Sequence, residues 1–161
     1  MIGKLSDIEI EELLQTQIVG RIGCIDDGKS YVVPISYAYE EGCVYCHSFE
    51  GKKIDIMRKN PKVCFQVDET TDMSNWKSVI AWGEFEELTN QVQRKKALQI
   101  LLKRPLPIRS SVTTHLGPVW PFTGDGNNGL NDIPGIVFRI QLKEKTGKCE
   151  SPSASPGLPY Y

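Results

Sequence analysis

The sequence predicts a mainly β protein, a six-stranded antiparallel barrel with a few short helices. Six segments have the alternating or β-branched composition of strands, and several are joined by short turn sequences. The segments also lack the strand–helix–strand rhythm of a parallel sheet. An antiparallel barrel is therefore favoured over a doubly wound α/β fold.

The first predicted element is a short amphipathic helix over residues 6–17. Ser6-Asp7-Ile8-Glu9 has the form of a capping box, in which the serine and the glutamate satisfy backbone amides at a helix start. Ile10, Leu13 and Leu14 follow at helical spacing and would form one apolar side. We expect this helix to close one end of the fold.

The first three strands are expected at residues 18–25, 31–39 and 43–49. Asp26-Asp27-Gly28-Lys29 and Glu40-Glu41-Gly42 separate them and have the composition of tight turns. The short third strand leads through Glu50-Gly51 toward a further helix.

That helix is expected at about residues 52–59 and ends before Pro61, because proline disfavours helical backbone in the residue that precedes it. Residues 63–67 then alternate between apolar and other side chains, which predicts a fourth strand. A fifth strand is expected over 78–86, after a polar connection at 69–77.

A helix is predicted across residues 91–103, capped by Thr89 or Asn90. The long segment 104–134 is rich in proline, glycine, serine and asparagine, and we interpret it as a lid, a partner-contacting arm or a partly disordered loop. The sixth strand is expected over 136–142. One domain over residues 1–148 and a disordered tail over 149–161 complete the predicted organisation.

Composition excludes several broad classes. The 161 residues carry a formal net charge of −1, which gives no general attraction to nucleic acid or to an anionic membrane. The N-terminus has early acidic residues and no long apolar run, so neither a secretory signal nor a membrane span is expected. Five cysteines without a signal favour reduced thiols, and the cytoplasm is the expected compartment.

The candidate chemistry lies in His47-Ser48-Phe49-Glu50-Gly51-Lys52-Lys53. Ser48 offers a hydroxyl, Gly51 permits close approach of the backbone, and the amides of a helix start lie beside Lys52 and Lys53. Together these groups suit a bound phosphate. The alternative interpretation is a solvated basic helix face.

Pro34 interrupts a run of residues that favour strands. A proline there removes a backbone donor, so the strand is an edge, is bulged, or borders something other than a strand. A flat ring is one such neighbour, with backbone groups of Val33, Pro34 and Ile35 serving its hydrogen-bonding edge. An ordinary edge-strand proline is the alternative.

Residues 20–69 resemble the pyridoxamine 5′-phosphate oxidase-like FMN-binding split-barrel family, and within it the nitroimidazole-resistance branch. The shared features are Gly20-Arg21, Gly28, Val33-Pro34, Tyr45-Cys46-His47-Ser48, Gly51-Lys52-Lys53, Asn60-Pro61 and Val63-Cys64-Phe65. Looser agreement continues through Ser78-Val79 and Gly83 to Arg139-Ile140 and Thr146-Gly147-Lys148. Only segment 104–134 departs from the family pattern.

The resemblance implies a homodimeric split barrel that binds FMN, with FAD as the alternative, at the subunit interface. It also implies that His47 takes part in reducing a nitro group. A histidine can exchange protons at neutral pH, so His47 is a candidate proton donor, and the alternatives are that it orients the flavin or packs at a strand end. Arg21 would neutralise flavin or substrate charge or form an ion pair across the dimer. Trp82 or Trp120 would stack on the ring or pack in the core or at an interface.

The leading functional hypothesis is an FMN-dependent oxidoreductase acting on a small flat substrate such as a nitroaromatic, with NAD(P)H or another carrier as electron source. The alternatives are a pyridoxamine-phosphate-type oxidase, a flavin carrier or redox-sensing module without turnover, and a haem-binding relative. The sequence Cys43-Val44-Tyr45-Cys46-His47 matches a c-type haem attachment pattern, but it lies in a predicted strand, where positions three apart face opposite sides. No ligand set for zinc is apparent either.

Overall fold

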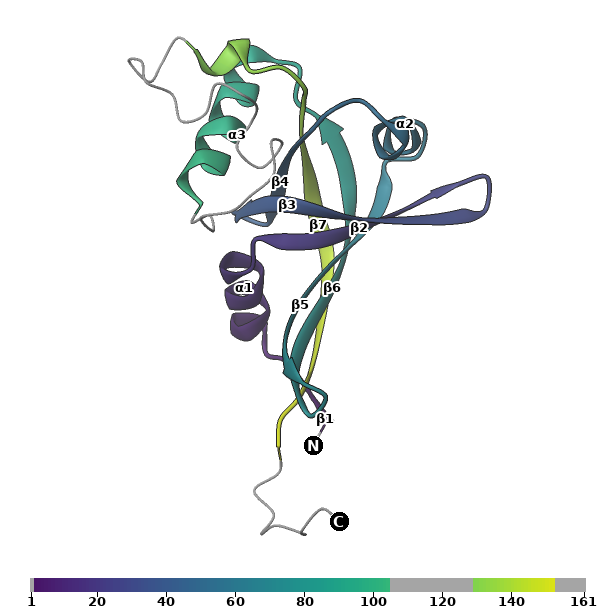
Figure 1. Ribbon diagram of the computed structural model, residues 1–161, viewed down its shortest axis with the longest axis vertical. Helices are drawn as coiled ribbons and strands as arrows, with labels where there is room; N and C mark the ends of the chain where they lie inside the picture. Colours follow the sequence, from purple (N-terminus) through teal and green to yellow (C-terminus); the bar gives the residue numbers. More distant parts are fainter. Residues whose placement is uncertain (1, 105–128, 153–161) are drawn as a thin grey trace.

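In the computed structural model, residues 2–104 and 129–152 are described, and they form one antiparallel barrel with helices packed on its outside and at one end (Figure 1). The strands of this part of the chain are β1 (Ile2–Lys4), β2 (Val19–Asp26), β3 (Lys29–Glu40), β4 (Cys43–Ser48), β5 (Lys62–Asp72), β6 (Asn75–Glu87) and β7 (Ile136–Glu150). The helices are α1 (Asp7–Thr16), α2 (Lys52–Lys59), α3 (Gln91–Lys103) and the 3-10 turn η1 (Leu130–Asp132).

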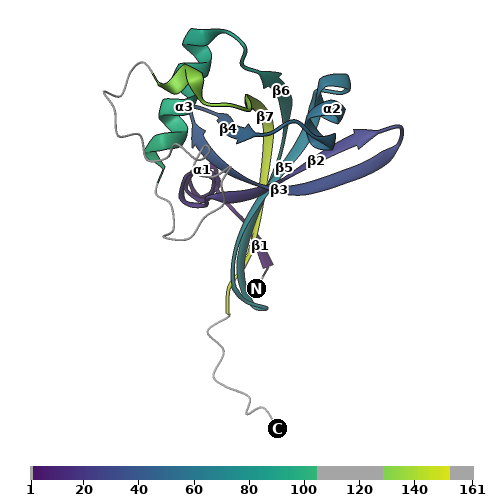
Figure 2. The same cartoon turned by 45° about the horizontal axis from the view of Figure 1, so that its top comes forward.

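The sheet order is β1-β7-β4-β3-β2-β5-β6, and a further pairing between β6 and β7 closes the ring. Every pairing is antiparallel, so the predicted fold class is confirmed. The long β5, β6 and β7 extend together beyond the ring as an arm, where β1 adds to the edge of β7 (Figure 2).

The strand count and two boundaries differ from the prediction. The seventh strand is β1, whose three residues are too few to show a pattern in the sequence. The polar segment 69–77 is mostly strand, because β5 and β6 continue pairing out to Asp72 and Asn75. Strand β7 runs through Glu150, eight residues past the predicted end of the sixth strand at residue 142. Residues 153–161 and most of segment 104–134 lie outside the described residues.

The helices begin and end where the sequence predicts. Ser6 and Glu9 form the capping box of α1, and the Asn90 side chain accepts hydrogen bonds from two amides at the start of α3. Helix α1 closes one end of the barrel, where the hydroxyl of the buried Tyr37 donates to the Leu14 carbonyl at 2.8 Å. The main core therefore lies inside the barrel beneath α1.

A second apolar cluster lies outside the barrel, between α3, η1 and one face of β4. Alternate residues of β4 belong to the two clusters: Val44 and Cys46 face the main core, whereas Cys43 and Tyr45 face α3. All six residues of β4 are buried as a result. A helix-covered strand of this kind places its two sets of side chains in different chemical surroundings, which matters for His47 and Ser48.

Candidate functional site

Strand β3 changes partners near its middle. Residues Lys29–Ser36 pair with β2, and Tyr37–Glu40 pair with β4 on the other edge. Pro34 lies opposite Arg21, three residues before the pairing with β4 begins. Within the part of the chain that the structure describes, residues 33–36 therefore have no strand neighbour on the edge away from β2. The missing backbone donor of Pro34 costs the ladder nothing on that edge.

Ser36 lies at the end of this open edge and was not predicted as a site residue. Its Oγ atom is buried and has no hydrogen-bond partner among the described residues. A buried hydroxyl without a partner is costly, so it indicates a position where a further polar group is expected. The only sequence signal was a small polar residue within an apolar strand, which by itself is too common to identify a site.

The start of α2 lies beyond β4 and differs from the starts of the other two α-helices. No side chain caps it: the N-cap is Gly51, whose carbonyl accepts the amides of Ile54 and Asp55 at 3.0 and 3.1 Å. A Cβ atom on Gly51 would have nothing within 4 Å, so the space beside the helix start is open. Exposed amides at a helix start with open space before them suit an anion.

The two lysines at this helix start lie in different environments. Lys53 is half-buried, and burial lowers the pKa of its ammonium group. It forms no ion pair within the described residues, and the group that affects it is the thiol of Cys46, whose own pKa burial raises to about 12. Lys52 is exposed, and its Nζ lies 5.1 Å from the centroid of the Tyr31 ring. Lys53 is therefore a partly desolvated cation without a carboxylate counter-ion in the part of the chain that the structure describes.

Ser48 and His47 are consecutive in β4, so their side chains point to opposite faces. Ser48 is buried on the face of Cys46, and its Oγ donates to the Phe49 carbonyl at 3.1 Å. Lys53 also lies near Cys46, on the side of β4 that Ser48 faces.

His47 lies on the α3 face, with 5% of its surface exposed. Its Nε2 atom is 2.8 Å from the Pro134 carbonyl oxygen, which only accepts, so Nε2 carries the proton. Gly135 has a φ of +106°, and a Cβ atom there would lie 2.7 Å from the His47 Nε2. The structure thus places the imidazole under the Pro134–Gly135 turn, on the opposite face of β4 from Ser48.

Arg21 and Trp82 lie on the outer face of the sheet. The Arg21 guanidinium donates to the Gln66 side-chain oxygen at 3.0 Å and to Asp68 at 2.7 Å. Hydrogen bonds from Gln66 and Thr70, with the charge of Arg21, hold the pKa of Asp68 below its usual range. Arg21 therefore forms an ion pair within its own chain, and its predicted roles toward the flavin, the substrate or a dimer partner stay predictions.

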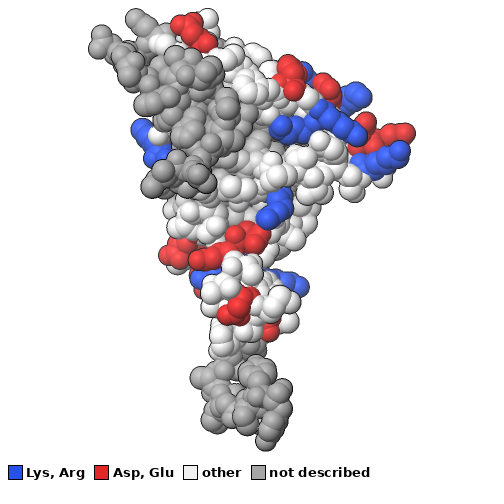
Figure 3. Space-filling view, viewed as in Figure 1, with Lys and Arg blue, Asp and Glu red and all other residues white. Residues whose placement is uncertain are grey.

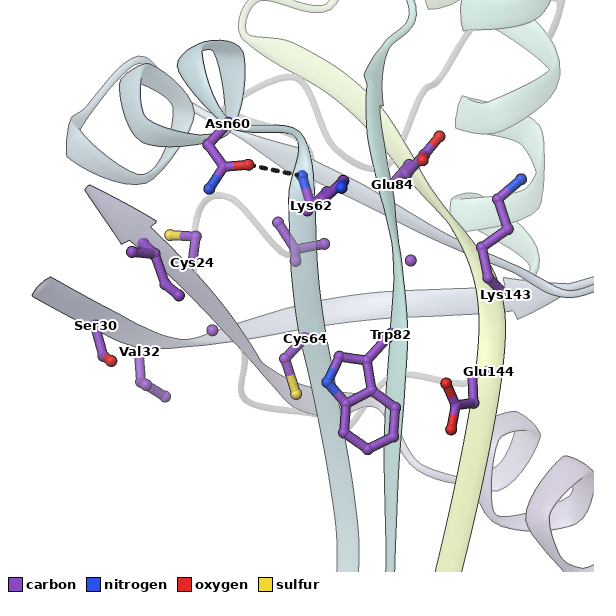
Figure 4. A pocket seen from close by; sticks show the side chains of 14 residues that line it. Cys24, Ser30, Val32, Asn60, Lys62, Cys64, Trp82, Glu84, Lys143 and Glu144 are labelled. Atoms are coloured by element: carbon purple, nitrogen blue, oxygen red, sulfur yellow. Dashed lines mark hydrogen bonds between the residues drawn. The ribbon is translucent and has the colours of Figure 1, made fainter. Parts of the chain in front are cut away.

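Trp82 is 43% exposed and lines a pocket of about 680 Å³ on the same outer face (Figure 4). It lies next to Cys64, its pairing partner in β5, and Cys64 in turn pairs with Gly23 of β2. Lys62, Glu84, Lys143 and Glu144 also line this pocket. The floor is mainly apolar, and the charged side chains surround it.

The predicted site residues therefore fall into three groups. Val33, Pro34, Ile35, Ser48, Gly51, Lys52 and Lys53 lie along the open edge of β3 and the start of α2. Arg21 and Trp82 lie on the outer sheet face, and His47 lies under the turn before β7. Basic and acidic residues are interspersed around α2 and the β2–β3 hairpin, with no large patch of one sign on the face shown in Figure 3.

None of the helices in the described residues is long and apolar enough to cross a membrane. No group of three or more histidine, cysteine or acidic side chains in the same part of the chain is arranged to hold a metal ion.

The order of the strands, the change of partner in β3 and the basic helix start after β4 can be compared with known proteins. A family model described as pyridoxamine 5′-phosphate oxidase matches residues 6–120. This chain belongs to the pyridoxamine 5′-phosphate oxidase-like family. The family resemblance predicted from its motifs is confirmed.

Several other proteins resemble this chain over most of its length. A crystal structure of a FAD-binding protein from Mesorhizobium loti is 33% identical, covers 94% of this chain and 99% of its own, and has a TM-score of 0.73. An uncharacterized protein from Rhizobium meliloti is 36% identical over 105 residues, which are 63% of this chain and 70% of that protein. A candidate 5-nitroimidazole antibiotic resistance protein from Bacteroides thetaiotaomicron has 20% identity over 92% of this chain and 87% of its own, with a TM-score of 0.68, and shows the shared fold alone.

Proposed function

We propose that this oxidase-like protein binds a flavin along the open edge of β3, with the flavin phosphate at the start of α2. The observation that carries the proposal is Lys53, a half-buried ammonium group without a carboxylate partner in the described chain, beside an uncapped helix start. An anionic phosphate would compensate both the ammonium group and the helix amides. The similarity to the FAD-binding protein of Mesorhizobium loti supports a flavin as the source of that phosphate.

The remaining residues of the edge fit the rest of such a cofactor. Val33, Pro34 and Ile35 lie along the part of β3 that β4 leaves unpaired, and the buried Ser36 hydroxyl there has no partner in the described residues. An isoalloxazine edge carries both donors and acceptors for these groups. Gly51 leaves open the approach to the helix start, where Lys52 adds an exposed second charge. FMN is the proposed cofactor, and FAD, which shares the same phosphate, is the alternative.

The proposed activity is an FMN-dependent oxidoreduction of a small flat acceptor such as a nitroimidazole or another nitroaromatic. A bound flavin would supply two-electron transfer from NAD(P)H or another donor, and the protein would supply position and electrostatics. The chain's own contribution is to hold the phosphate, to border the ring edge with β3 and to exclude water from the buried side of the edge.

For His47 we propose a positioning role first. Its Nε2 proton is committed to the Pro134 carbonyl, so delivering that proton to a substrate requires this hydrogen bond to open. That His47 donates a proton to the substrate stays a prediction. The variants His47→Ala and His47→Gln separate this catalytic role from the positioning role.

We also propose a homodimer in which a second copy covers the outer sheet face. Val32, Ile80 and Trp82 are 63%, 39% and 43% exposed, and the 680 Å³ pocket lies among this part of the sheet. Exposed apolar side chains clustered around a pocket are more typical of an interface than of a solvated surface. The two-fold partner implied by the family resemblance is the occupant that we propose.

The test begins with the colour of freshly purified protein. A yellow protein that releases FMN or FAD on denaturation supports the cofactor assignment, and chromatography of the released flavin identifies which of the two is bound. Anaerobic reduction with NADH or NADPH, followed by addition of a nitroimidazole, then measures turnover. A protein that binds flavin but reduces no acceptor would be a flavin carrier and would contradict the proposed oxidoreductase activity. A colourless protein that binds neither FMN nor FAD on reconstitution would overturn the proposal.

A further inference from the structure

Arg58 connects three parts of the chain that meet near the proposed phosphate site. Its guanidinium donates two hydrogen bonds to Glu50, at 2.8 and 2.9 Å, and two to Glu87, also at 2.8 and 2.9 Å. Arg58 is in the last turn of α2, Glu50 precedes the N-cap Gly51, and Glu87 is the last residue of β6. We refer to Glu50, Arg58 and Glu87 as the arginine clasp.

The geometry of the clasp is the strong form of a surface ion pair. Each carboxylate receives two parallel N–H groups, an arrangement that fixes orientation as well as distance. The hydrogen bonds from Arg58 hold the pKa of Glu87 below its usual range, and the two carboxylates raise the pKa of the guanidinium above its usual value. Arg58 and Glu87 are therefore charged at neutral pH.

The arginine clasp fixes the chain at the start of α2, which has no side-chain cap. Ser6 caps α1 and Asn90 caps α3, whereas no side chain caps α2. Glu50, the residue before the Gly51 cap, is instead fixed by the hydrogen bonds that its side chain accepts from Arg58 at the far end of the same helix. A glycine with open space around it has no side-chain packing of its own to define its position. Glu50 is then the nearest side chain with a fixed partner on the approach to the helix start.

The other end of the clasp is attached to the barrel. Glu87 ends β6, and the backbone amide of Phe85 donates to the Pro61 carbonyl at 2.8 Å just beyond α2. The end of α2 is thereby fixed on β6 by backbone and side chain together. Through Arg58 this fixed end also determines where Glu50, and with it Gly51, lies relative to the sheet.

We propose that Arg58 is a positioning residue that holds the Glu50–Gly51 turn, so that the start of α2 and Lys53 are set to select a phosphorylated flavin over riboflavin. The inference rests on the proposed function, because it assigns the phosphate to this helix start. Its consequence is specific: loss of the clasp weakens binding of the phosphate and leaves binding of the ring unchanged.

The experiment compares the affinities of the flavin-depleted full-length protein for FMN and for riboflavin, by quenching of flavin fluorescence. Arg58→Gln is expected to lower the preference for FMN by about tenfold, an effect typical of coupling within one hydrogen-bonded network. The affinity for riboflavin is expected to stay within about twofold of the wild-type value. Effects at independent sites usually add to within about 0.4 kcal/mol, which is about twofold in affinity.

Glu86→Gln is the matched control. Glu86 adjoins Glu87 on β6 and holds a different arginine, Arg139, at 2.6 Å, with no link to Glu50. This variant removes a surface ion pair of the same type from the same strand end. It is expected to retain the wild-type preference for FMN.

Glu50→Ala separates positioning from charge. If Arg58 acted only by neutralising Glu50, removal of that carboxylate would strengthen FMN binding, because a negative charge near the phosphate would be gone. A positioning role predicts the opposite: Glu50→Ala lowers the preference for FMN, and Arg58→Gln adds little when combined with it.

A wild-type protein that binds FMN and riboflavin with equal affinity contradicts the phosphate site of the proposed function. A wild-type preference for FMN that persists in Arg58→Gln contradicts the positioning role alone. A parallel loss of FMN and riboflavin affinity in Arg58→Gln, accompanied by a lower melting temperature, would show a general structural role and would also overturn the inference.

Discussion

The Nε2 atom of His47 donates a 2.8 Å hydrogen bond to the carbonyl oxygen of Pro134, which lies 87 positions along the chain. This bond attaches the segment that leads into β7 to the buried face of β4. Arg94 of α3 donates to carbonyl groups of the same segment, including those of Leu130 and Ile133. The segment before β7 is thus held from the sheet on one side and from α3 on the other.

His47→Ala is expected to destabilise the protein by about 1–3 kcal/mol, because the Pro134 carbonyl loses its imidazole donor in a buried position. Urea unfolding of the flavin-free protein measures the change. His47→Gln keeps a side-chain donor and is expected to recover part of the loss. Equal stability of wild type and His47→Ala would contradict the positioning role.

The same two variants test the catalytic hypothesis through turnover. A general acid contributes about 10²–10⁴-fold, so a catalytic His47 predicts that His47→Gln regains stability and flavin but not the nitro-reductase rate. A positioning His47 predicts that stability, flavin content and rate recover together. Steady-state rates measured on flavin-saturated protein separate the two results.

Lys53→Glu is expected to abolish retention of the flavin while the protein stays folded, since a repulsive charge would replace the half-buried ammonium group at the helix start. Lys52→Glu is the matched control, because its ammonium group is exposed and lies over the Tyr31 ring. We expect its flavin content to fall less. The ratio of flavin absorbance to protein absorbance after purification gives the result, and equal ratios in both variants and the wild type would remove the phosphate site.

Stability without flavin should depend on pH through Lys53. Burial lowers the pKa of this ammonium group in the folded protein, so between the lowered pKa and the ordinary lysine value near 10.5 the unfolded chain binds more protons. Stability from this group therefore rises with pH across that window and is lowest where Lys53 is fully charged. Lys53→Met should then be more stable than the flavin-free wild type at pH 7, by a margin that shrinks toward pH 10.5. Thermal unfolding at both pH values checks the sign, and a margin that grows with pH would contradict it.

Trp82→Asp is expected to convert the proposed dimer into monomers, because it places a charge among the exposed apolar side chains of the outer sheet face. Val92→Asp is the control: Val92 is 78% exposed on α3, away from that face. Sedimentation velocity measures both variants and the wild type. A wild-type monomer with its flavin fully bound would contradict the proposed interface.

The local elements could be predicted because their signals lie within a few neighbouring residues. Ser6 and Glu9 specify the start of α1, Asn90 the start of α3, and Pro61 the end of α2. Capping, turn and helix-breaking preferences depend on backbone geometry that a short segment sets by itself. Strand β1 was not predicted, because three residues are too few to show an alternation of apolar and polar side chains. They form a strand only by pairing with β7.

The candidate site could be predicted only where its residues are close in sequence. The segment from Ser48 to Lys53 contains a hydroxyl, a glycine and two lysines close together, so the proposed phosphate site could be predicted from the sequence. The clasp was not visible, because Glu87 lies 29 positions from Arg58 and charged residues at the ends of strands and helices are common. Ser36 likewise could not be identified from the sequence, because only the structure shows that its hydroxyl is buried without a hydrogen-bond partner among the described residues.

The sequence by itself determined the family, the antiparallel order of strands and helices, and the basic helix start after β4. Only the tertiary structure decided which side of β4 each residue faces, and therefore that His47 bonds to Pro134 while Ser48 lies on the side of Cys46 and Lys53. It also decided that Lys53 is half-buried and Lys52 exposed, although the two lysines are adjacent and chemically identical. The physical reason is that burial and pairing depend on which distant segments cover a residue, and no local pattern encodes that cover.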